Sequence, residues 1–364
     1  MTDCKPPSRF SSETGIQSLS MSQEARKNAG AYYTPDGAVA SLVSWAVRTP
    51  RDQMLDPSCG DGRFLALHHY SGGVERDTAT VKLARERVPW AMIHEGDFFE
   101  WAAETRERFD CAAGNPPFIR YQRFSGGVRT AALSLCARLG AKFTALTSSW
   151  APFLVGAASL LRRGGRMAFV VPAEIGHAPY ASPLLTYLAE HFDLVQIVAV
   201  RNKLFPDLSE SCWLLYANGY GGKSSGFKLS LVERFQFSPS PPSDGVFVSL
   251  GEWHLWNRRI RPFLLAGSVR SFYQAVTAES QTLSLGQVSR VGIGYVTGAN
   301  DFFHLRPSEA QQIGIPERFL CAAVRSSKQL SAASVTPNTV RSWLRNDDPV
   351  LLMRLTAQHF LIEG

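Results

Sequence analysis

Apolar runs of strand length alternate with helix-like segments between residues 53 and 217 of the chain. Seven runs have the length and composition of buried strands: 53–57, 72–75, 91–97, 109–115, 166–172, 194–200 and 212–217. Short turns separate them from the helix-like segments. Repeated alternation of strand and helix is typical of a parallel sheet with helices on both faces. The chain is therefore expected to have an α/β fold.

The segments between the runs predict five helices. They are 35–47, 63–69, 78–87 after a capping Asp77, a long helix up to Arg163, and 181–191. The long helix includes 19 consecutive uncharged residues, 143–161, about the length that spans a bilayer. Because Pro152 lies inside this stretch and two arginines follow it, we interpret it as a buried helix and expect no membrane association.

The amino-acid composition of the sequence changes after Asn218. Gly, Ser and Pro cluster at 219–226 and 238–245, which marks loops or a linker. A helix-like segment follows at 260–278, a β-like stretch at 289–305 and another helix-like segment at about 348–359. We therefore expect a polar N-terminal arm over 1–30, a first domain over 31–218, a linker region over 219–285 and a small second domain over 286–364.

Cysteine spacing and charge limit the class of protein. The six cysteines show no C-x-x-C spacing, which argues against a zinc site and against a disulfide framework. The first residues lack an apolar segment behind their positive charges, so we expect no signal peptide and a cytoplasmic protein. The formal net charge is +7, and residues 251–364 carry 12 basic and 8 acidic side chains. This excess suits a polyanionic partner, although a solvated face explains it about as well.

A glycine-containing turn follows the first strand. It runs from Asp56 to Gly62 and includes Ser58, Cys59 and Gly60. Glycines let the backbone approach a ligand closely, and open α/β sheets bind cofactors at this position. The third glycine of the dinucleotide fingerprint is absent, so a structural turn is the alternative.

Two further acidic residues stand at strand ends. Glu75 ends the second strand, where an acidic residue accepts hydrogen bonds from a ribose; an exposed strand-end glutamate is the plainer alternative. Asp97 ends the third strand and is followed by Phe98 and Phe99. It could bind an adenine amino group beneath a phenyl ring, or cap a helix that begins with core aromatics. Three acidic groups at three successive strand ends favour a ligand site.

The fourth strand ends in Asn115-Pro116-Pro117-Phe118. Two consecutive prolines prevent further sheet pairing and make the backbone rigid. The turn therefore presents an amide oxygen, a carbonyl oxygen and an aromatic ring in a fixed arrangement. These groups suit a planar base that carries an amino group, and a structural turn with a buried phenylalanine is the alternative.

Together these segments resemble the gamma-type N6-adenine DNA methyltransferases, in which the S-adenosylmethionine (SAM) site precedes the catalytic motif. The matching segments are 32–35 (Tyr-Tyr-Thr-Pro), 56–62, Glu75, Asp97-Phe98 and 115–118, in the family's order. Looser matches are 169–172, 204–216 and 291–303. The resemblance covers roughly residues 26–305. It implies a Rossmann-like SAM-dependent methyltransferase fold, with a mostly parallel seven-stranded sheet and a small C-terminal domain.

The resemblance also implies roles for individual residues. The methionine part of SAM is expected to contact Tyr33, Thr34, Pro35, Asp56, Ser58, Cys59, Gly60 and Gly62. Glu75 is expected to bind the ribose, and Asp97 with Phe98 the adenine ring of SAM. Asn115 and the carbonyl of Pro116 would accept hydrogen bonds from the amino group of the target adenine, and Pro117 keeps the turn rigid. Phe118 would stack on the flipped-out base, with Phe205 on its other face.

The implied activity is a site-specific, adenine-specific DNA methyltransferase of a restriction-modification or related defence system. Double-stranded DNA is the expected partner, together with a possible separate restriction or specificity subunit, and no metal is expected. Two alternatives stay open: a methyltransferase that uses the same turn on a protein glutamine or on RNA, and a DNA-binding component without turnover. Relatives with the segment 291–303 are expected to continue beyond Gly364, so we expect a short or partial DNA-reading region.

Overall fold

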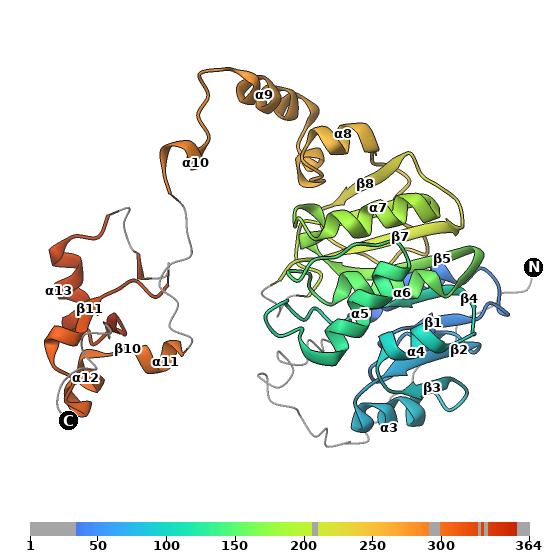
Figure 1. Cartoon of the computed structure of the whole chain (residues 1–364), viewed down its shortest axis with the longest axis horizontal. Coiled ribbons are helices and arrows are strands. Elements are labelled where there is room, and N and C mark those ends of the chain that lie inside the picture. Colours follow the sequence, from blue (N-terminus) through green and yellow to red (C-terminus); the bar gives the residue numbers. More distant parts are fainter. Residues whose placement is uncertain (1–33, 206–209, 291–298, 327–328, 331–333, 355–364) are drawn as a thin grey trace, which may run out of the picture. The chain divides into compact units, whose positions relative to one another are not determined.

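The computed structural model describes residues 34–205, 210–290, 299–326, 329–330 and 334–354 (Figure 1). The chain divides into two compact units, Met1–Thr277 and Ala278–Gly364. The predicted N-terminal arm and Tyr33 lie outside the described residues.

The first unit contains a nine-stranded sheet in the order β3-β2-β1-β4-β5-β7-β6-β8-β9. The strands are β1 Met54–Asp56, β2 Ser71–Glu75, β3 Met92–Glu95, β4 Phe109–Gly114, β5 Leu161–Pro172, β6 Phe192–Val200, β7 Cys212–Tyr220, β8 Gly226–Val232 and β9 Val246–Ser249. Only β7 and β9 run antiparallel to their neighbours within this sheet. The predicted α/β class with a mostly parallel sheet is confirmed.

The sheet has two strands more than the seven predicted. The additional strands, β8 and β9, come from the segment 219–285 that we predicted as a linker. Phe227 and Leu229 alternate with polar residues along β8 and are buried in the core. This short apolar alternation lies between two Gly, Ser and Pro clusters, which obscured it in the sequence.

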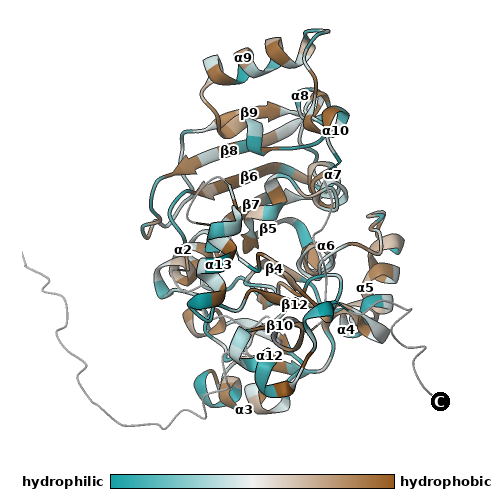
Figure 2. Cartoon of the chain, turned by 90° about the vertical axis from the view of Figure 1, so that its left-hand side faces the viewer, coloured by the Kyte–Doolittle hydropathy of each residue, from teal (hydrophilic) through white to brown (hydrophobic). Residues whose placement is uncertain are grey.

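Helices cover both faces of the sheet. They are α2 Asp36–Ala46, α3 Thr78–Arg87, α4 Phe98–Glu104, α5 Gly126–Arg138, α6 Trp150–Ser159, α7 Ala181–His191 and α8 Leu250–Leu255. Helix α9 Gly267–Ala278 follows α8 and has no buried residue. Figure 2 shows α2 on one side of the sheet and α5 to α7 on the other. Alternate residues of β5 accordingly enter two cores, since Met167 and Phe169 face α4 to α7 while Ala168 and Val170 face α2.

The predicted long helix up to Arg163 is wrong in its extent. Helix α6 has ten residues, and Arg162 to Gly165 belong to β5 instead of a turn. Arg162 donates hydrogen bonds to Asp110 at 2.6 Å and to Gln53 at 2.8 Å, which holds this segment beside β4. In the part of the chain that the structure describes, no helix has the length and apolarity needed to cross a membrane.

The predicted helix 63–69 is also shorter, because only the 3₁₀ turn η1 Leu65–Leu67 forms. Leu65 is fully buried beneath the sheet edge, and β2 begins at Ser71, whose hydroxyl donates to the carbonyl of His68 at 2.8 Å.

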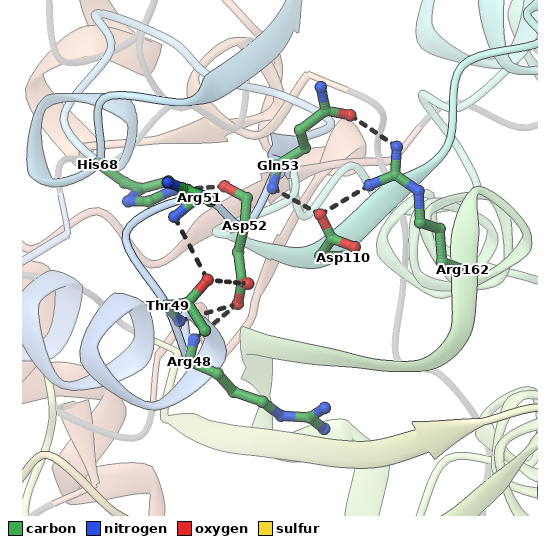
Figure 3. A network of polar contacts seen from close by, with 8 residues as sticks. All are labelled: Arg48, Thr49, Arg51, Asp52, Gln53, His68, Asp110 and Arg162. Carbon is green, nitrogen blue, oxygen red and sulfur yellow. Dashed lines mark hydrogen bonds and ion pairs between the residues drawn. The ribbon is translucent and has the colours of Figure 1, made fainter.

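A polar network fixes the amino ends of β1, β4 and β5 (Figure 3). The carboxylate of Asp52 accepts hydrogen bonds from the backbone N–H of Arg48 and from the hydroxyl of Thr49, both at 2.7 Å. Asp110 accepts from the backbone N–H of Gln53 at 2.8 Å. Since these contacts lie at the opposite strand ends from residues 56–62, they serve the fold.

The second unit holds a three-stranded antiparallel sheet in the order β10-β12-β11. Its strands are β10 His304–Leu305, β11 Leu320–Ala322 and β12 Leu351–Met353. The helices from α10 on are α10 Leu285–Val288, α11 Asn300–Phe303, α12 Pro307–Ile313 and α13 Pro337–Arg345. The other 3₁₀ turns among the described residues are η2 Ala173–Gly176 and η3 Arg261–Leu264 in the first unit and η4 Glu317–Phe319 in the second.

Two predictions for the C-terminal part need correction. Among the described residues of the β-like stretch 289–305, Asn300–Phe303 form helix α11 and His304–Leu305 form strand β10; residues 291–298 lie outside the described residues. The described part of the helix-like segment 348–359 contains strand β12. Its apolar residues pair with β10 on one side and β11 on the other, and this pairing overrides the helical spacing.

Candidate active site

The four polar segments singled out in the sequence meet at one edge of the sheet. Strands β1 to β4 are parallel neighbours in the order β3-β2-β1-β4, so their carboxyl ends lie side by side. Asp56 and Glu75 end β1 and β2. Asp97 follows β3, and Asn115 follows β4. The topology thus brings together residues that are well separated in the sequence.

The turn after β1 requires its glycines. Gly60 and Gly62 have φ angles of +54° and +82°, in the left-handed region that side chains disfavour. The backbone N–H of Gly60 donates to Glu75 Oε2 at 3.1 Å, and that of Cys59 donates to the carbonyl of Val74 at 2.9 Å. The turn is therefore folded back onto the end of β2.

Asp56 lies in an unusual electrostatic position. Its side chain accepts the backbone N–H of Ser58 at 3.1 Å, and the residue is 1% exposed. Burial raises the pKa of the Asp56 carboxyl from its ordinary 3.8 to about 8; the Ser58 hydrogen bond opposes this rise, and the Glu75 and Asp61 carboxylates add to it. Asp61, in contrast, forms ion pairs with Arg63 at 3.2 Å and Arg87 at 2.5 Å.

The raised pKa of Asp56 predicts that stability falls with rising pH. A carboxyl with a pKa of about 8 in the folded state and 3.8 when unfolded takes up a proton on folding between these pH values, so its stabilising contribution is complete below pH 3.8 and is lost as the pH rises through 8. From pH 6 to 8 the free energy of unfolding is expected to fall by about 2 to 3 kcal/mol, which lowers Tm by several degrees. Thermal unfolding of the wild type and of Asp56→Asn between pH 5 and 9 measures it. A difference in Tm between the two that does not change with pH would contradict the assignment.

Glu75 organises the turn that follows β2. Its Oε1 atom accepts the backbone N–H groups of Arg76 and Asp77, both at 2.8 Å, and its Oε2 atom accepts that of Gly60. The residue is half-buried. An ionised carboxylate has about four acceptor positions. Glu75 is thus fixed in place and retains the capacity to accept a further hydrogen bond.

Asp97 is the N-cap of α4. Its Oδ1 atom accepts the backbone N–H groups of Phe99 at 2.9 Å and Glu100 at 3.2 Å. Phe98 is 3% exposed and stacks on Phe153 with ring centroids 5.1 Å apart. The structure therefore shows the contacts of the plainer alternative, a capping aspartate followed by core aromatics. The Phe98 ring also contacts Phe99 and Trp101, so it lies in the core, whereas the resemblance implied a contact with the adenine ring of SAM.

The Asn115-Pro116-Pro117-Phe118 turn directly adjoins the Asp56 loop. The hydroxyl of Ser58 donates to the carbonyl oxygen of Asn115 at 3.4 Å. Pro116 is buried, whereas Asn115, Pro117 and Phe118 are half-buried. The loop predicted to bind SAM is thus in contact with the turn predicted to bind the target base.

The structure also brings the two predicted aromatic residues together. Phe205 is 6% exposed and belongs to the apolar cluster on the α2 side of the sheet. Phe118 packs against this cluster and against the core on the other side. The segment 206–209 that follows Phe205 lies outside the described residues.

The described part of the Tyr-Thr-Pro segment lies close to the same loop. Thr34 is 4% exposed, and Pro35 is the N-cap of α2. An ion pair of 3.5 Å joins Asp36, in the first turn of α2, to Arg63 just after the glycine turn. The start of α2 thus lies beside the loop of residues 56–62.

The described cysteines of the first unit are poor nucleophiles. Cys59, Cys111, Cys136 and Cys212 are all buried. Burial raises the pKa of each thiol, to about 12 for Cys136 and Cys212. Because the thiolate is the reactive form, these side chains are structural.

One residue of the site was missed in the sequence. The hydroxyl of Ser149 forms hydrogen bonds with the carbonyl of Pro117 and with the backbone N–H of Ile119, the two residues that flank Phe118. The sequence signal was the polar run Thr147-Ser148-Ser149, which suits the start of a helix. We had placed it inside the long predicted helix.

Two family models match the chain. The Eco57I restriction-modification methylase model matches residues 75–205, and the model of the C-terminal domain of type II methyltransferase M.Eco57I matches residues 257–361. The first match contains Glu75, Asp97, Asn115 and Phe205. The predicted resemblance to DNA methyltransferases of the restriction-modification type is confirmed.

Individual relatives include enzymes of two kinds. Type II methyltransferase M.XamI of Xanthomonas campestris pv. amaranthicola is 23% identical over 85% of this chain and 59% of its own length. The tRNA1(Val) (adenine(37)-N6)-methyltransferase of Actinobacillus succinogenes is 34% identical over 42% of this chain and 66% of its own length. This chain spans 35 to 66% of the curated relatives that it matches.

A solved structure supports the fold. The structure of the DrdV–DNA complex has a TM-score of 0.57 at 11% identity, over 92% of this chain and 44% of that one. At this identity the likeness concerns the fold alone.

Proposed function

The chain is similar to the DNA methyltransferases of restriction-modification systems, and we propose that it transfers a methyl group from SAM to the N6 amino group of an adenine flipped out of double-stranded DNA. The observation that carries this proposal is the direct contact between the two motifs. The hydroxyl of Ser58, in the loop proposed for SAM, donates to the carbonyl of Asn115, in the turn proposed for the base, at 3.4 Å.

The residues around the Asp56 loop fit SAM. The positive φ angles of Gly60 and Gly62 let the backbone approach a ligand. Strand-end carboxylates offer acceptors for hydroxyl, amino and cationic groups, with Glu75 for the ribose and Asp97 for the adenine. Thr34 and Pro35 line the start of α2 beside the same loop. When bound, SAM supplies a methyl group on a positively charged sulfur, and transfer of that methyl group leaves a neutral thioether.

The adjoining turn fits the amino group of adenine. The exocyclic nitrogen of adenine is a weak nucleophile because its lone pair is delocalised into the ring. The amide oxygen of Asn115 and the carbonyl of Pro116 would accept hydrogen bonds from its two N–H groups and stabilise the positive charge that develops as the N–C bond forms and the C–S bond breaks; the methylated nitrogen then releases one proton to solvent. Positioning and electrostatics are then sufficient for direct transfer. The buried cysteines, whose pKa values are raised by burial, have no part in it.

Aromatic residues account for capture of the base. A paired adenine hides its amino group, so the base must leave the duplex at a cost of a few kcal/mol. Stacking on Phe118, with Phe205 against the other face, offsets this cost. The basic residues of the second unit would contact the DNA backbone. We propose residues 31–218 as the catalytic domain, residues 286–364 as a small or partial recognition domain, and a separate restriction or specificity subunit as a possible partner.

A second candidate substrate is RNA. It is favoured by the 34% identity to a protein named as a tRNA adenine-N6 methyltransferase. The choice is tested by incubating the protein with methyl-labelled SAM and, separately, unmethylated duplex DNA, tRNA and protein. Label recovered in DNA as N6-methyladenine supports the proposal, whereas label in tRNA or protein only would replace it. Binding of DNA without any label would indicate a component without turnover.

Phe118→Ala is expected to weaken base capture by about 1–3 kcal/mol, which lowers kcat/KM on duplex DNA roughly 5- to 150-fold. The comparison is made in the same variant between a paired and a mispaired target adenine. A mispaired base costs less to unstack, so activity on it is expected to stay closer to that of the wild type. Undiminished activity on paired duplex DNA is incompatible with the role given to Phe118.

A further inference from the structure

A buried serine outside the recognised motifs holds the Asn-Pro-Pro-Phe turn. Ser149 is fully buried at the start of α6, 0% exposed. Its hydroxyl donates to the carbonyl of Pro117 and accepts the backbone N–H of Ile119 at 3.0 Å. Its own backbone N–H donates to the carbonyl of Ile119 at 2.9 Å. One residue thus fixes the chain on both sides of Phe118.

The chemistry of the turn explains why a hydroxyl is placed there. Pro116 and Pro117 have no backbone N–H, so these two residues cannot donate hydrogen bonds that would stabilise the turn from within. A hydroxyl can donate and accept at the same time. Ser149 therefore bonds to the carbonyl before Phe118 and to the N–H after it.

Ser149 is itself held in a rigid environment. The next residue, Trp150, is fully buried, and its indole N–H donates to the hydroxyl of Tyr180 at 3.4 Å. The Tyr180 hydroxyl donates in turn to the carboxylate of Glu174, which follows β5. This chain of contacts links the start of α6 to the carboxyl end of the sheet. The position of Ser149, and with it the position of the turn, is therefore fixed relative to the sheet.

We propose that Ser149 is a positioning residue, which fixes the Asn115 to Phe118 turn in the geometry that a flipped base requires. This rests on the proposed function, in which Phe118 stacks on that base. Catalytic groups that are misplaced by about 1 Å can lose on the order of 100-fold in rate. Loss of the Ser149 hydroxyl should therefore reduce transfer without changing the cofactor site.

The test compares Ser149→Ala with a matched control. Thr147→Val removes a hydroxyl from the same segment, and Thr147 is 1% exposed with an Oγ1 atom that has no hydrogen-bond partner among the described residues. Hydrogen exchange of the peptide that spans 112–124 reports on the turn directly, because Phe118 and Ile119 carry its first amides after the prolines. Transfer from labelled SAM to unmethylated phage DNA and calorimetric SAM binding are measured on the same samples.

For Ser149→Ala, amide exchange in this peptide is expected to accelerate at least tenfold and kcat to fall about 10- to 100-fold. SAM affinity should stay within about twofold, and Thr147→Val should match the wild type in all three measurements. If Ser149→Ala does not fold, Ser149→Cys, with a weaker hydrogen-bonding group of similar size, takes its place and should show a smaller change in the same direction.

The outcomes separate this proposal from the proposed function. Unchanged exchange in the Ser149 variant overturns the positioning role whatever the activity. Faster exchange with kcat equal to that of Thr147→Val overturns it as well. If exchange is faster in the variant but the wild-type protein labels no DNA, Ser149 still fixes the turn and the proposed function is refuted.

Discussion

Replacing Asn115 by alanine is expected to lower methyl transfer by at least about 10²- to 10³-fold while SAM binding stays close to that of the wild type. The amide oxygen of Asn115 is proposed to act on the target amino group. Its backbone carbonyl, which accepts the Ser58 hydroxyl, survives the substitution. Single-turnover transfer of labelled methyl groups and calorimetric SAM titration measure the two quantities.

Asn202→Ala is the control for this experiment. Asn202 is exposed on the same unit, and its backbone N–H bonds to the carbonyl of Glu233 at 2.9 Å, which the substitution preserves. We expect wild-type transfer and affinity from it. A parallel collapse of SAM affinity in the Asn115 variant would show that Asn115 supports the cofactor site, and the role assigned to it would be wrong.

Gly114→Ala is expected to weaken SAM binding at least tenfold and to destabilise the first unit by about 1–3 kcal/mol. A Cβ atom at Gly114 would lie 2.6 Å from Oδ1 and 3.2 Å from Cγ of Asp56, and 3.2 Å from a ring carbon of Phe169. Both neighbours are buried, so neither can move aside freely. The Asp56 side chain would be displaced within the loop proposed for SAM. Calorimetry and thermal unfolding measure the two effects.

Gly37→Ala makes the same chemical change in open space. A Cβ atom there meets nothing within 4 Å, and the residue lies in helix α2. Alanine is favoured over glycine in helices by up to about 1 kcal/mol, so this variant should be at least as stable as the wild type and should bind SAM normally. Wild-type SAM binding by Gly114→Ala would show that Asp56 takes no part in holding the cofactor.

Local sequence patterns were sufficient to predict one helix and one helix cap. Helix 181–191 was predicted with its observed bounds, because its apolar spacing continues without interruption. The capping role of Asp77 was also predicted, and its side chain accepts the backbone N–H of Thr80 at 2.8 Å. The cap is made by a residue three positions away, and the apolar spacing of the helix marks the residues that are buried in the core.

The errors occurred where distant contacts decide the local structure. Residues 143–161 are uncharged, and the apolar run 150–161 continues into the strand without a break, so periodicity alone could not show that β5 begins at Leu161. The pairing of β5 with β4 and β7 determined that boundary. Strand β8 was likewise hidden between loop-forming clusters, and its pairing with β6 made it part of the sheet.

The sequence by itself determined the α/β class, the order of the strand-end motifs and the family that they resemble, because residue types at fixed spacing carry that information. Only the tertiary structure decided which groups touch. It buried Asp56 against Gly114, which raises the pKa of that carboxyl, and it placed Ser149 on the backbone around Phe118. Burial and hydrogen bonding depend on neighbours brought together by the sheet, and no sequence pattern around either residue encodes those neighbours.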